Sequence, residues 1–131
     1  MGRLIDGDWH TDAQLDASDA GEFKRDETAF RDWITGSRHP DADPSGRFDP
    51  EPGRYHLYVS YACPWAHRTL LLRSLKGLED AISVDVVSPI RGADGWAFDP
   101  DWDGATVDSQ YGADYLRELY KKADPDFSGR V

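Results

Sequence analysis

The chain has 131 residues, which is enough for one domain with a modest core and too few for two ordinary domains. Its 25 acidic and 15 basic residues give a net charge of −10, which repels phosphate backbones and anionic lipids and argues against nucleic acid as a partner. No stretch approaches the roughly 20 apolar residues of a membrane span, and a single cysteine cannot form an internal disulfide, so we expect a soluble protein of the reducing cytoplasm.

The acidic residues are mostly aspartate, and arginine outnumbers lysine. This bias resembles the composition of proteins from salt-loving cells, in which surface carboxylates hold hydration water. An ordinary solvated acidic surface explains the same composition, and both interpretations stay open.

The first part of the chain is rich in glycine, proline and aspartate, and the stretch 39–53 alone contains four prolines. Because proline has no backbone N–H and interrupts regular structure, we predict an irregular N-terminal arm over 1–54. Within the arm, apolar residues of 27–34 share one helical face, which predicts a short amphipathic helix docked on a larger body. We expect Trp33 to serve packing rather than chemistry. The apolar face consists of Ala29, Phe30, Trp33 and Ile34.

A strand is predicted over 55–62, where β-branched and aromatic residues dominate and side chains alternate in polarity. Pro64 opens a helix predicted over 64–76, and Gly77 follows its last turn, the usual placing of proline and glycine around a helix. A second strand is predicted over 82–87. A helix between two strands predicts a right-handed crossover and parallel pairing.

A loop that contains glycine and tryptophan is predicted over 89–110, followed by a helix over 112–123 with one apolar face. Residues 55–131 therefore form a small α/β unit of two strands and two helices. Such a unit buries too little apolar surface to offset chain entropy, so we expect the fold to continue beyond these residues. The apolar face of the second helix comprises Tyr115, Leu116, Leu119 and Tyr120.

Cys63, the single cysteine, lies where the first predicted strand gives way to the first helix. The unpaired N–H groups and the positive dipole end of a helix stabilise a thiolate, so this position favours a nucleophile at neutral pH. A buried, unreactive cysteine is the alternative. Ala66 stands where a C-x-x-C pair would have its second thiol, so a mixed disulfide at Cys63 would need an external small thiol, such as glutathione, to resolve it.

Two kinds of metal site compete with this chemistry. Residues 99–104 match the first half of a calcium-binding loop, but its twelfth position is Gln110, which supplies no carboxylate. His67 stands four residues after Cys63, and His56 could join them as a zinc ligand. Both patterns are incomplete, so no metal is predicted.

The segment 58–79, with the sequence YVSYACPWAHRTLLLRSLKGLE, closely resembles the glutathionyl-hydroquinone reductases, the Xi class of glutathione transferases. Three further segments occur in the same order as in that family: GEFKRDETAFRDWI (21–34), GWAFDPD (95–101) and DPDFSGRV (124–131). Four separated motifs in one order are a specific signal, and together they extend over most of residues 21–131.

The resemblance implies a partial thioredoxin-like fold, the type of the N-terminal domain of glutathione transferases, over 55–131, preceded by the arm over 1–54. In the family, a cis-proline strand, a turn for the γ-glutamyl group and an all-helical C-terminal domain follow. None of these is found in the 131 residues, so the chain resembles an N-terminal fragment of a protein whose full-length form is expected to be a homodimer.

The resemblance also implies a reaction. The thiolate of Cys63 would attack the sulfur of a glutathionyl-hydroquinone, expel the hydroquinone and hold glutathione as a mixed disulfide, which a second glutathione would release. Trp96, Arg130 and Val131 would hold glutathione, the arginine through its charge and the valine through its backbone. Trp96 could instead cover the core, and Arg130 could be solvated.

The expected function is glutathione-dependent reduction of glutathionyl-hydroquinones by a single-cysteine mechanism. No bound cofactor is expected, and the cosubstrate would be glutathione or a related thiol such as γ-glutamylcysteine. The expected partners are this thiol and the quinone conjugate, with no nucleic acid and no membrane. The alternative is a non-catalytic, truncated transferase-like fragment or a binding module.

Overall fold

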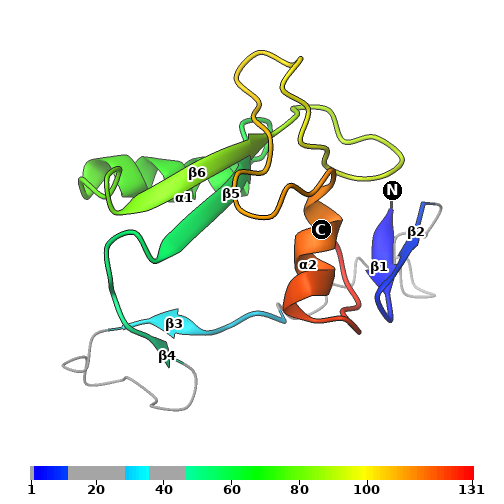
Figure 1. Ribbon diagram of the computed structural model, residues 1–131, viewed down its shortest axis with the longest axis horizontal. Coiled ribbons are helices and arrows are strands. Elements are labelled where there is room, and N and C mark those ends of the chain that lie inside the picture. Colours follow the sequence, from blue (N-terminus) through cyan, green and yellow to red (C-terminus); the bar gives the residue numbers. More distant parts are fainter. Residues whose placement is uncertain (1, 12–28, 36–46) are drawn as a thin grey trace, which may run out of the picture.

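The computed structural model describes residues 2–11, 29–35 and 47–131 (Figure 1). The elements are, in chain order, β1 (Arg3–Ile5), β2 (Asp8–His10), β3 (Trp33–Ile34), β4 (Arg47–Phe48), β5 (Tyr55–Ser60), α1 (Pro64–Leu75), β6 (Ile82–Val87) and α2 (Leu116–Ala123). In Figure 1, α2 lies between the β5–α1–β6 unit and the hairpin of β1 and β2. Within the described ranges, no helix is long and apolar enough to cross a membrane.

β5 and β6 form a parallel two-stranded sheet with α1 as the crossover, as predicted. The register pairs Tyr55 with Ile82 at one end and Ser60 with Val87 at the other. β6 occupies the predicted residues. β5 ends earlier than predicted because the chain turns toward the helix, and the N–H of Cys63 donates to the carbonyl oxygen of Ser60 at 3.0 Å.

α1 begins at Pro64 and ends at Leu75, one residue short of the predicted 64–76. Proline suits the first helical position, where no backbone N–H is needed. The helix stops because Gly77 adopts φ +64°, a left-handed conformation that glycine tolerates, and donates its N–H to the carbonyl oxygen of Ser74 at 3.0 Å.

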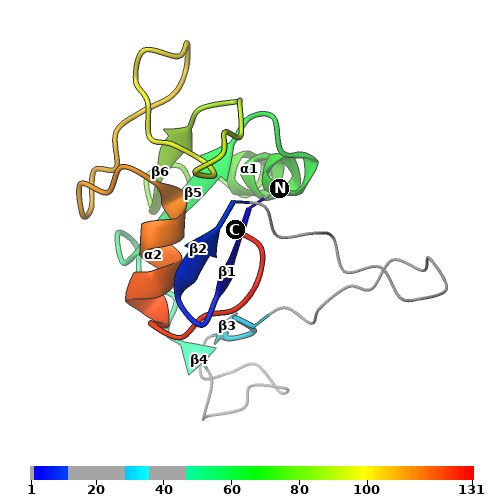
Figure 2. The ribbon, with the colours of Figure 1, turned by 90° about the vertical axis from the view of Figure 1, so that its right-hand side faces the viewer.

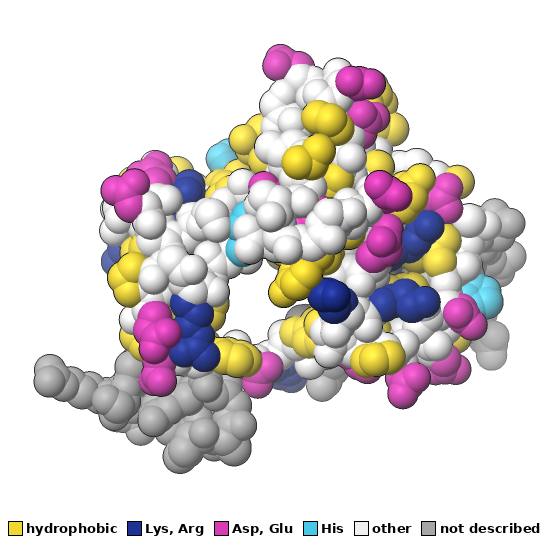
Figure 3. Space-filling view, in the orientation of Figure 1, with side chains coloured by type: hydrophobic (Ala, Val, Ile, Leu, Met, Phe, Trp, Pro, Cys, Tyr) yellow, Lys and Arg dark blue, Asp and Glu magenta, His cyan; other side chains and the backbone are white. Residues whose placement is uncertain are grey.

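The core is small, as expected from so few elements. α1 buries none of its side chains, and Leu71, Leu72 and Leu75 are all more than half exposed. Figure 3 shows hydrophobic side chains around an opening through this face of the molecule. Among the residues that the structure describes, the buried apolar side chains are Val59, Val86, Val87 and Phe98 near the sheet, and Leu4 and Phe127 near the hairpin.

The N-terminal residues form an ordered hairpin, which corrects the prediction of an irregular arm for residues 3–10. β1 pairs antiparallel with β2. Asp6 and Gly7 make the turn, with φ values of 48° and 78°. A type I′ turn requires positive φ at both central residues, and Asp-Gly is a favoured pair for it.

The hairpin packs against the C-terminal residues, and Figure 2 shows the C-terminal segment beside β1. Leu4 and Gly129 form an isolated antiparallel bridge, and the N–H of Gly7 donates to the carbonyl oxygen of Phe127 at 3.1 Å. Leu4 is completely buried, and Phe127 is nearly so. The two ends of the described chain therefore share one small apolar cluster.

The amphipathic helix predicted over 27–34 is wrong for the part that the structure describes, since residues 29–34 contain no helix. Trp33–Ile34 form β3 instead and pair in parallel with β4. The side chain of Trp33 is 73% exposed, so it does not pack as expected.

The reason lies in contacts distant along the chain. The Phe30 ring stacks on the ring of Phe127 with centroids 5.5 Å apart and meets the Tyr120 ring edge-on at 5.9 Å. A non-helical backbone brings Phe30 to these aromatic side chains, and such tertiary contacts override a weak local preference for helix.

α2 (Leu116–Ala123) was predicted over 112–123, so it begins four residues later than predicted and ends at the predicted residue. The preceding residues form a loop around the buried carboxylate of Asp108. This carboxylate accepts the N–H groups of Gln110 and Ala113, each at 3.0 Å. Backbone donors that point at a buried side chain are not available for a helical turn, which delays the helix.

Candidate active site

Cys63 is the N-cap residue of α1. Its backbone is extended, with φ −94° and ψ 116°, and its carbonyl oxygen accepts the first helical hydrogen bond, from the N–H of His67 at 3.1 Å. The thiol is free and half-buried, and the first turn of α1 contains no acidic residue. The sulfur therefore lies at the positive end of a helix dipole, without a carboxylate of that turn beside it.

Tyr120 of α2 lies near this thiol. Burial raises the pKa of Tyr120, and the charge of Cys63 raises it further. The Tyr120 ring also packs on that of Phe127, with centroids 5.1 Å apart. Because its pKa lies above the ordinary tyrosine value, the hydroxyl is protonated at neutral pH and can donate a hydrogen bond.

Trp96 directly follows a tight reversal of the chain. Gly92 and Gly95 exchange both of their backbone hydrogen bonds, at 3.1 and 3.2 Å. The carbonyl oxygen of Trp96 then accepts the N–H of Leu116 at 2.9 Å, which attaches the turn to the start of α2. The Trp96 side chain is half-buried, so part of it is accessible to a ligand.

Arg91 places a positive charge beside Trp96, and Arg130 lies within electrostatic range of Arg91. The guanidinium carbon of Arg91 lies 6.0 Å from the centroid of the Trp96 ring. Burial lowers the pKa of Arg91, and the positive charge of Arg130 lowers it further, so the two guanidinium groups lie near each other. Arg130 is exposed. Two neighbouring guanidinium groups are well suited to bind a carboxylate.

Val131 follows Arg130 and is half-buried. Its segment is held in place through Gly129, which forms hydrogen bonds with Leu4 of β1. Within the part of the chain that the structure describes, the N–H of Val131 has no hydrogen-bond partner. That N–H can therefore bind a peptide-like ligand in an extended conformation.

α2 connects the two halves of the candidate site. Its first residue, Leu116, binds the carbonyl of Trp96, and Tyr120, one turn later, lies near Cys63. The structure thus groups the thiol with Tyr120, Trp96 with Arg91, and Arg91 with Arg130.

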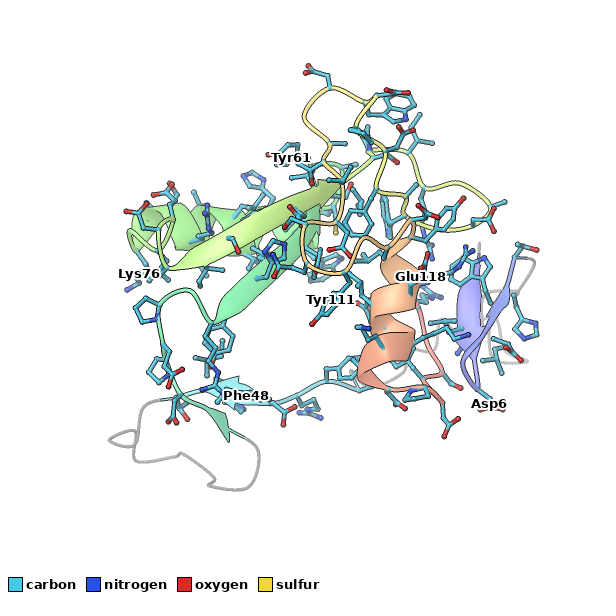
Figure 4. The ribbon with its side chains drawn as sticks, in the orientation of Figure 1. Asp6, Phe48, Tyr61, Lys76, Tyr111 and Glu118 are labelled. Carbon is cyan, nitrogen blue, oxygen red and sulfur yellow. The ribbon has the colours of Figure 1, made fainter. Side chains whose placement is uncertain are left out.

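A pocket of about 470 Å³ opens along α2. Tyr111, labelled in Figure 4, and Tyr120 both line it, so the pocket adjoins the surroundings of Cys63. The lining is mostly aromatic and aliphatic. It comprises Phe30, Tyr58, Tyr111, Leu116, Leu119, Tyr120, Lys122 and Ala123.

Two of the residues considered as metal ligands, His56 and Asp99, have other partners. Nδ1 of His56 lies 2.6 Å from the Ser83 hydroxyl, and Nε2 lies 3.0 Å from a carboxylate oxygen of Asp85. In the calcium-like stretch, the carboxylate of Asp99 accepts the N–H of Asp101 at 3.1 Å and so caps a turn. Among the described residues, no three histidine, cysteine or acidic side chains gather as a metal site.

Two site residues were missed from the sequence. Tyr120 entered only as part of an apolar helix face, and Arg91 entered in no motif. Arg91 precedes the turn between Gly92 and Gly95, and its position beside Trp96 depends on that turn. The hairpin that supports the site did have a local signal, the Asp6-Gly7 pair between two short alternating stretches.

Comparison with known proteins identifies close relatives, although no family model matches the chain. The chain is 52% identical over 131 residues to glutathionyl-hydroquinone reductase YqjG of Escherichia coli and 48% identical over 132 residues to glutathionyl-hydroquinone reductase PcpF of Sphingobium chlorophenolicum. The matches extend over 100% of this chain but only 40% and 38% of those proteins. The chain thus spans about two fifths of the length of these curated relatives.

Solved structures agree with this result. A Xi-class glutathione transferase from Natrialba magadii superposes with a TM-score of 0.81 at 55% identity, over 100% of this chain and 36% of that one. The glutathione-bound structure of YqjG from Escherichia coli superposes with a TM-score of 0.79 at 48% identity, over 99% of this chain and 36% of that one.

Proposed function

We propose a function for this chain as a member of the glutathionyl-hydroquinone reductases, the Xi class of glutathione transferases. The protein reduces glutathionyl-hydroquinones through the thiol of Cys63. The β5–α1–β6 unit is accordingly part of a thioredoxin-like domain of the glutathione transferase type. The names of the relatives support a glutathione-dependent transferase or reductase, and the substrate and the single-thiol route are our proposal.

The observation that carries the proposal is the position of the thiol. Cys63 is a free, half-buried N-cap residue at the positive end of α1. A thiolate is stabilised there, and a thiolate is the nucleophilic form of cysteine. Position 66 is alanine, so these residues offer no neighbouring second thiol, and we assign the resolving step to a thiol from solution.

The reaction has two balanced steps. First, the Cys63 thiolate attacks the sulfur of the conjugate; a disulfide bond forms between the two sulfurs, the ring carbon–sulfur bond breaks, and the ring carbon leaves with the electron pair and takes a proton. The hydroquinone is then free. Second, the thiolate of another glutathione attacks the mixed disulfide, which yields oxidised glutathione and regenerates Cys63. In the net reaction one free glutathione is consumed, its sulfur and the sulfur of the conjugate are joined in the disulfide, and the ring carbon is reduced by two electrons.

The remaining residues would bind the thiol peptide. Arg130 supplies positive charge for a carboxylate, Trp96 supplies a partly open aromatic face, and Val131 offers a backbone N–H that no described residue accepts. The expected partners are a small thiol and a quinone conjugate. We further propose that the full-length protein is a homodimer of the cytoplasm, where reduced glutathione keeps the thiol in its active form.

The test is steady-state turnover of glutathionyl-menadiol with glutathione by the protein expressed from its complete native reading frame. Cys63→Ser should reduce turnover by on the order of 10³-fold or more, because the nucleophile is lost. Thr69→Ala, an exposed substitution on the same helix, should leave turnover unchanged. Turnover by Cys63→Ser at the parent rate would refute the proposal.

A further inference from the structure

Arg91 has hydrogen-bond donors that the protein leaves unused. Its Nη2 donates to the carbonyl oxygen of Gly2 at 2.8 Å, whereas its Nε is buried without a hydrogen-bond partner among the described residues. In the part of the chain that the structure describes, no carboxylate forms an ion pair with Arg91. A guanidinium has five N–H donors, and leaving such donors unpaired in a partly buried position costs stability.

The electrostatic surroundings of Arg91 favour the binding of an anion beside it. Arg130 is close enough for its charge to lower the pKa of Arg91, which is the effect of like charges on each other. The Trp96 ring, with its centroid 6.0 Å from the guanidinium carbon, offers only weak cation–π compensation at that distance. A bound anion would relieve the repulsion and use the remaining donors.

The backbone around Arg91 is held firmly, so this charge is preorganised. The indole N–H of Trp9 donates to the carbonyl oxygen of Ala93 at 3.0 Å, and the Trp9 ring lies against Gly95. Together with the hydrogen bond from Arg91 to Gly2, these contacts fasten the turn to the N-terminal hairpin. Preorganisation lowers the entropy lost when a ligand binds.

We infer that Arg91 is a binding residue that acts with Arg130 to hold a carboxylate of the thiol peptide whose sulfur reacts at Cys63. The inference rests on the proposed function, because that function supplies the ligand class. Glutathione carries two carboxylates, one on its glycine and one on its γ-glutamyl group, and either could supply the anion.

The experiment measures the dissociation constant of S-methylglutathione by calorimetry, using the protein from the complete native reading frame. This probe keeps both carboxylates but cannot form a disulfide, so binding is separated from turnover. Arg91→Gln should weaken binding about 10-fold, the effect of losing a charge-assisted hydrogen bond, and Arg91→Lys should restore part of the loss. The glycine ethyl ester of the probe shows which carboxylate is bound. If Arg91→Gln no longer weakens binding of the ester, the glycine carboxylate is the partner; if it still does, the γ-glutamyl carboxylate is.

Arg117 provides the matched control. Its guanidinium lies 3.2 Å from the carboxylate of Asp94 and packs over the rings of Tyr115 and Trp9, so its charge already has a partner near the same turn. Arg117→Gln should leave the dissociation constant within about 2-fold of the parent value.

The outcomes separate the two proposals. Unchanged binding by Arg91→Gln, an equal loss with Arg117→Gln, or no binding by the parent protein would overturn the role of Arg91. An Arg91-dependent affinity in a protein that does not turn over glutathionyl-menadiol would support the role of Arg91 and refute the proposed reaction. Turnover of glutathionyl-menadiol with an affinity independent of Arg91 would support the proposed reaction and refute the role of Arg91.

Discussion

Leu4 and Gly129, near opposite ends of the chain, exchange two backbone hydrogen bonds, from the N–H of Leu4 at 3.0 Å and from the N–H of Gly129 at 2.9 Å. Gly129 immediately precedes Arg130 and Val131, the two residues expected to hold the thiol peptide. The N-terminal hairpin therefore holds the segment that carries Arg130 and Val131, although the hairpin lies far from Cys63 in sequence.

Gly7→Ala should loosen this support. A Cβ at Gly7 would lie 2.0 Å from the carbonyl oxygen of Pro125, and the φ of +78° is itself unfavourable for alanine. We expect the free energy of unfolding to fall by about 2–4 kcal/mol, from backbone strain and overlap together. Urea unfolding of the full-length protein measures the change.

Gly53→Ala is the matched control, because Gly53 has nearly the same φ, +77°, and a Cβ at this position would meet no atom of the described chain within 4 Å. Backbone strain alone should cost about 1 kcal/mol. Equal losses for the two variants would show that contact with Pro125 does not hold the hairpin.

Asp108→Asn should make stability depend less on pH. Burial acts to raise the pKa of Asp108, but hydrogen bonds from the backbone of Ala113 and Gln110 and from the Tyr58 hydroxyl outweigh it and hold the pKa below the usual value. The stabilisation is thus complete above the unfolded-state pKa of about 3.9 and is lost as pH falls through the folded-state value.

The parent protein should be more stable than Asp108→Asn by about 1–3 kcal/mol at neutral pH, since an amide cannot accept all of these hydrogen bonds. The difference should shrink below about pH 4. Urea unfolding at a series of pH values measures it, and a difference that stays constant down to the lowest pH would contradict the assignment.

Cys63→Ser should lower the pKa of Tyr120, because removing the thiolate removes one of the two causes that raise it. Burial should still hold the pKa above the ordinary tyrosine value. NMR titration of ring-labelled tyrosines measures the shift. Tyr58 is the internal control, since burial and Asp108 raise its pKa without a contribution from Cys63. An unchanged Tyr120 titration would place its hydroxyl outside the range of the thiol.

The β5–α1–β6 unit was predictable because its signals are local. Pro64 and Gly77 mark the ends of α1, and β-branched residues mark 82–87, so both elements lie within a residue of their predicted bounds. The position of Cys63 as the N-cap of α1 follows from the same signals, which is why the thiol could be placed from the sequence.

The parts that failed depend on contacts between distant residues. Phe30 has the spacing of a helix face, but it packs on Phe127 from a segment that is not helical. Arg91 carries no local signal, since its neighbours Trp96 and Arg130 reach it only after the chain has folded. The hairpin turn at Asp6-Gly7 was also missed, but for another reason: its Asp-Gly pair is a local signal that the sequence interpretation did not use.

The central claim is that Cys63 takes glutathione from the conjugate. The most direct measurement is intact-mass spectrometry of the full-length protein mixed with glutathionyl-menadiol and no free glutathione, followed by peptide mapping. We predict one glutathione bound per protein as a disulfide at Cys63, one menadiol released for each, and removal of the adduct when glutathione is added. Release of menadiol without an adduct at Cys63, or an adduct of equal yield in Cys63→Ser, would contradict the mechanism.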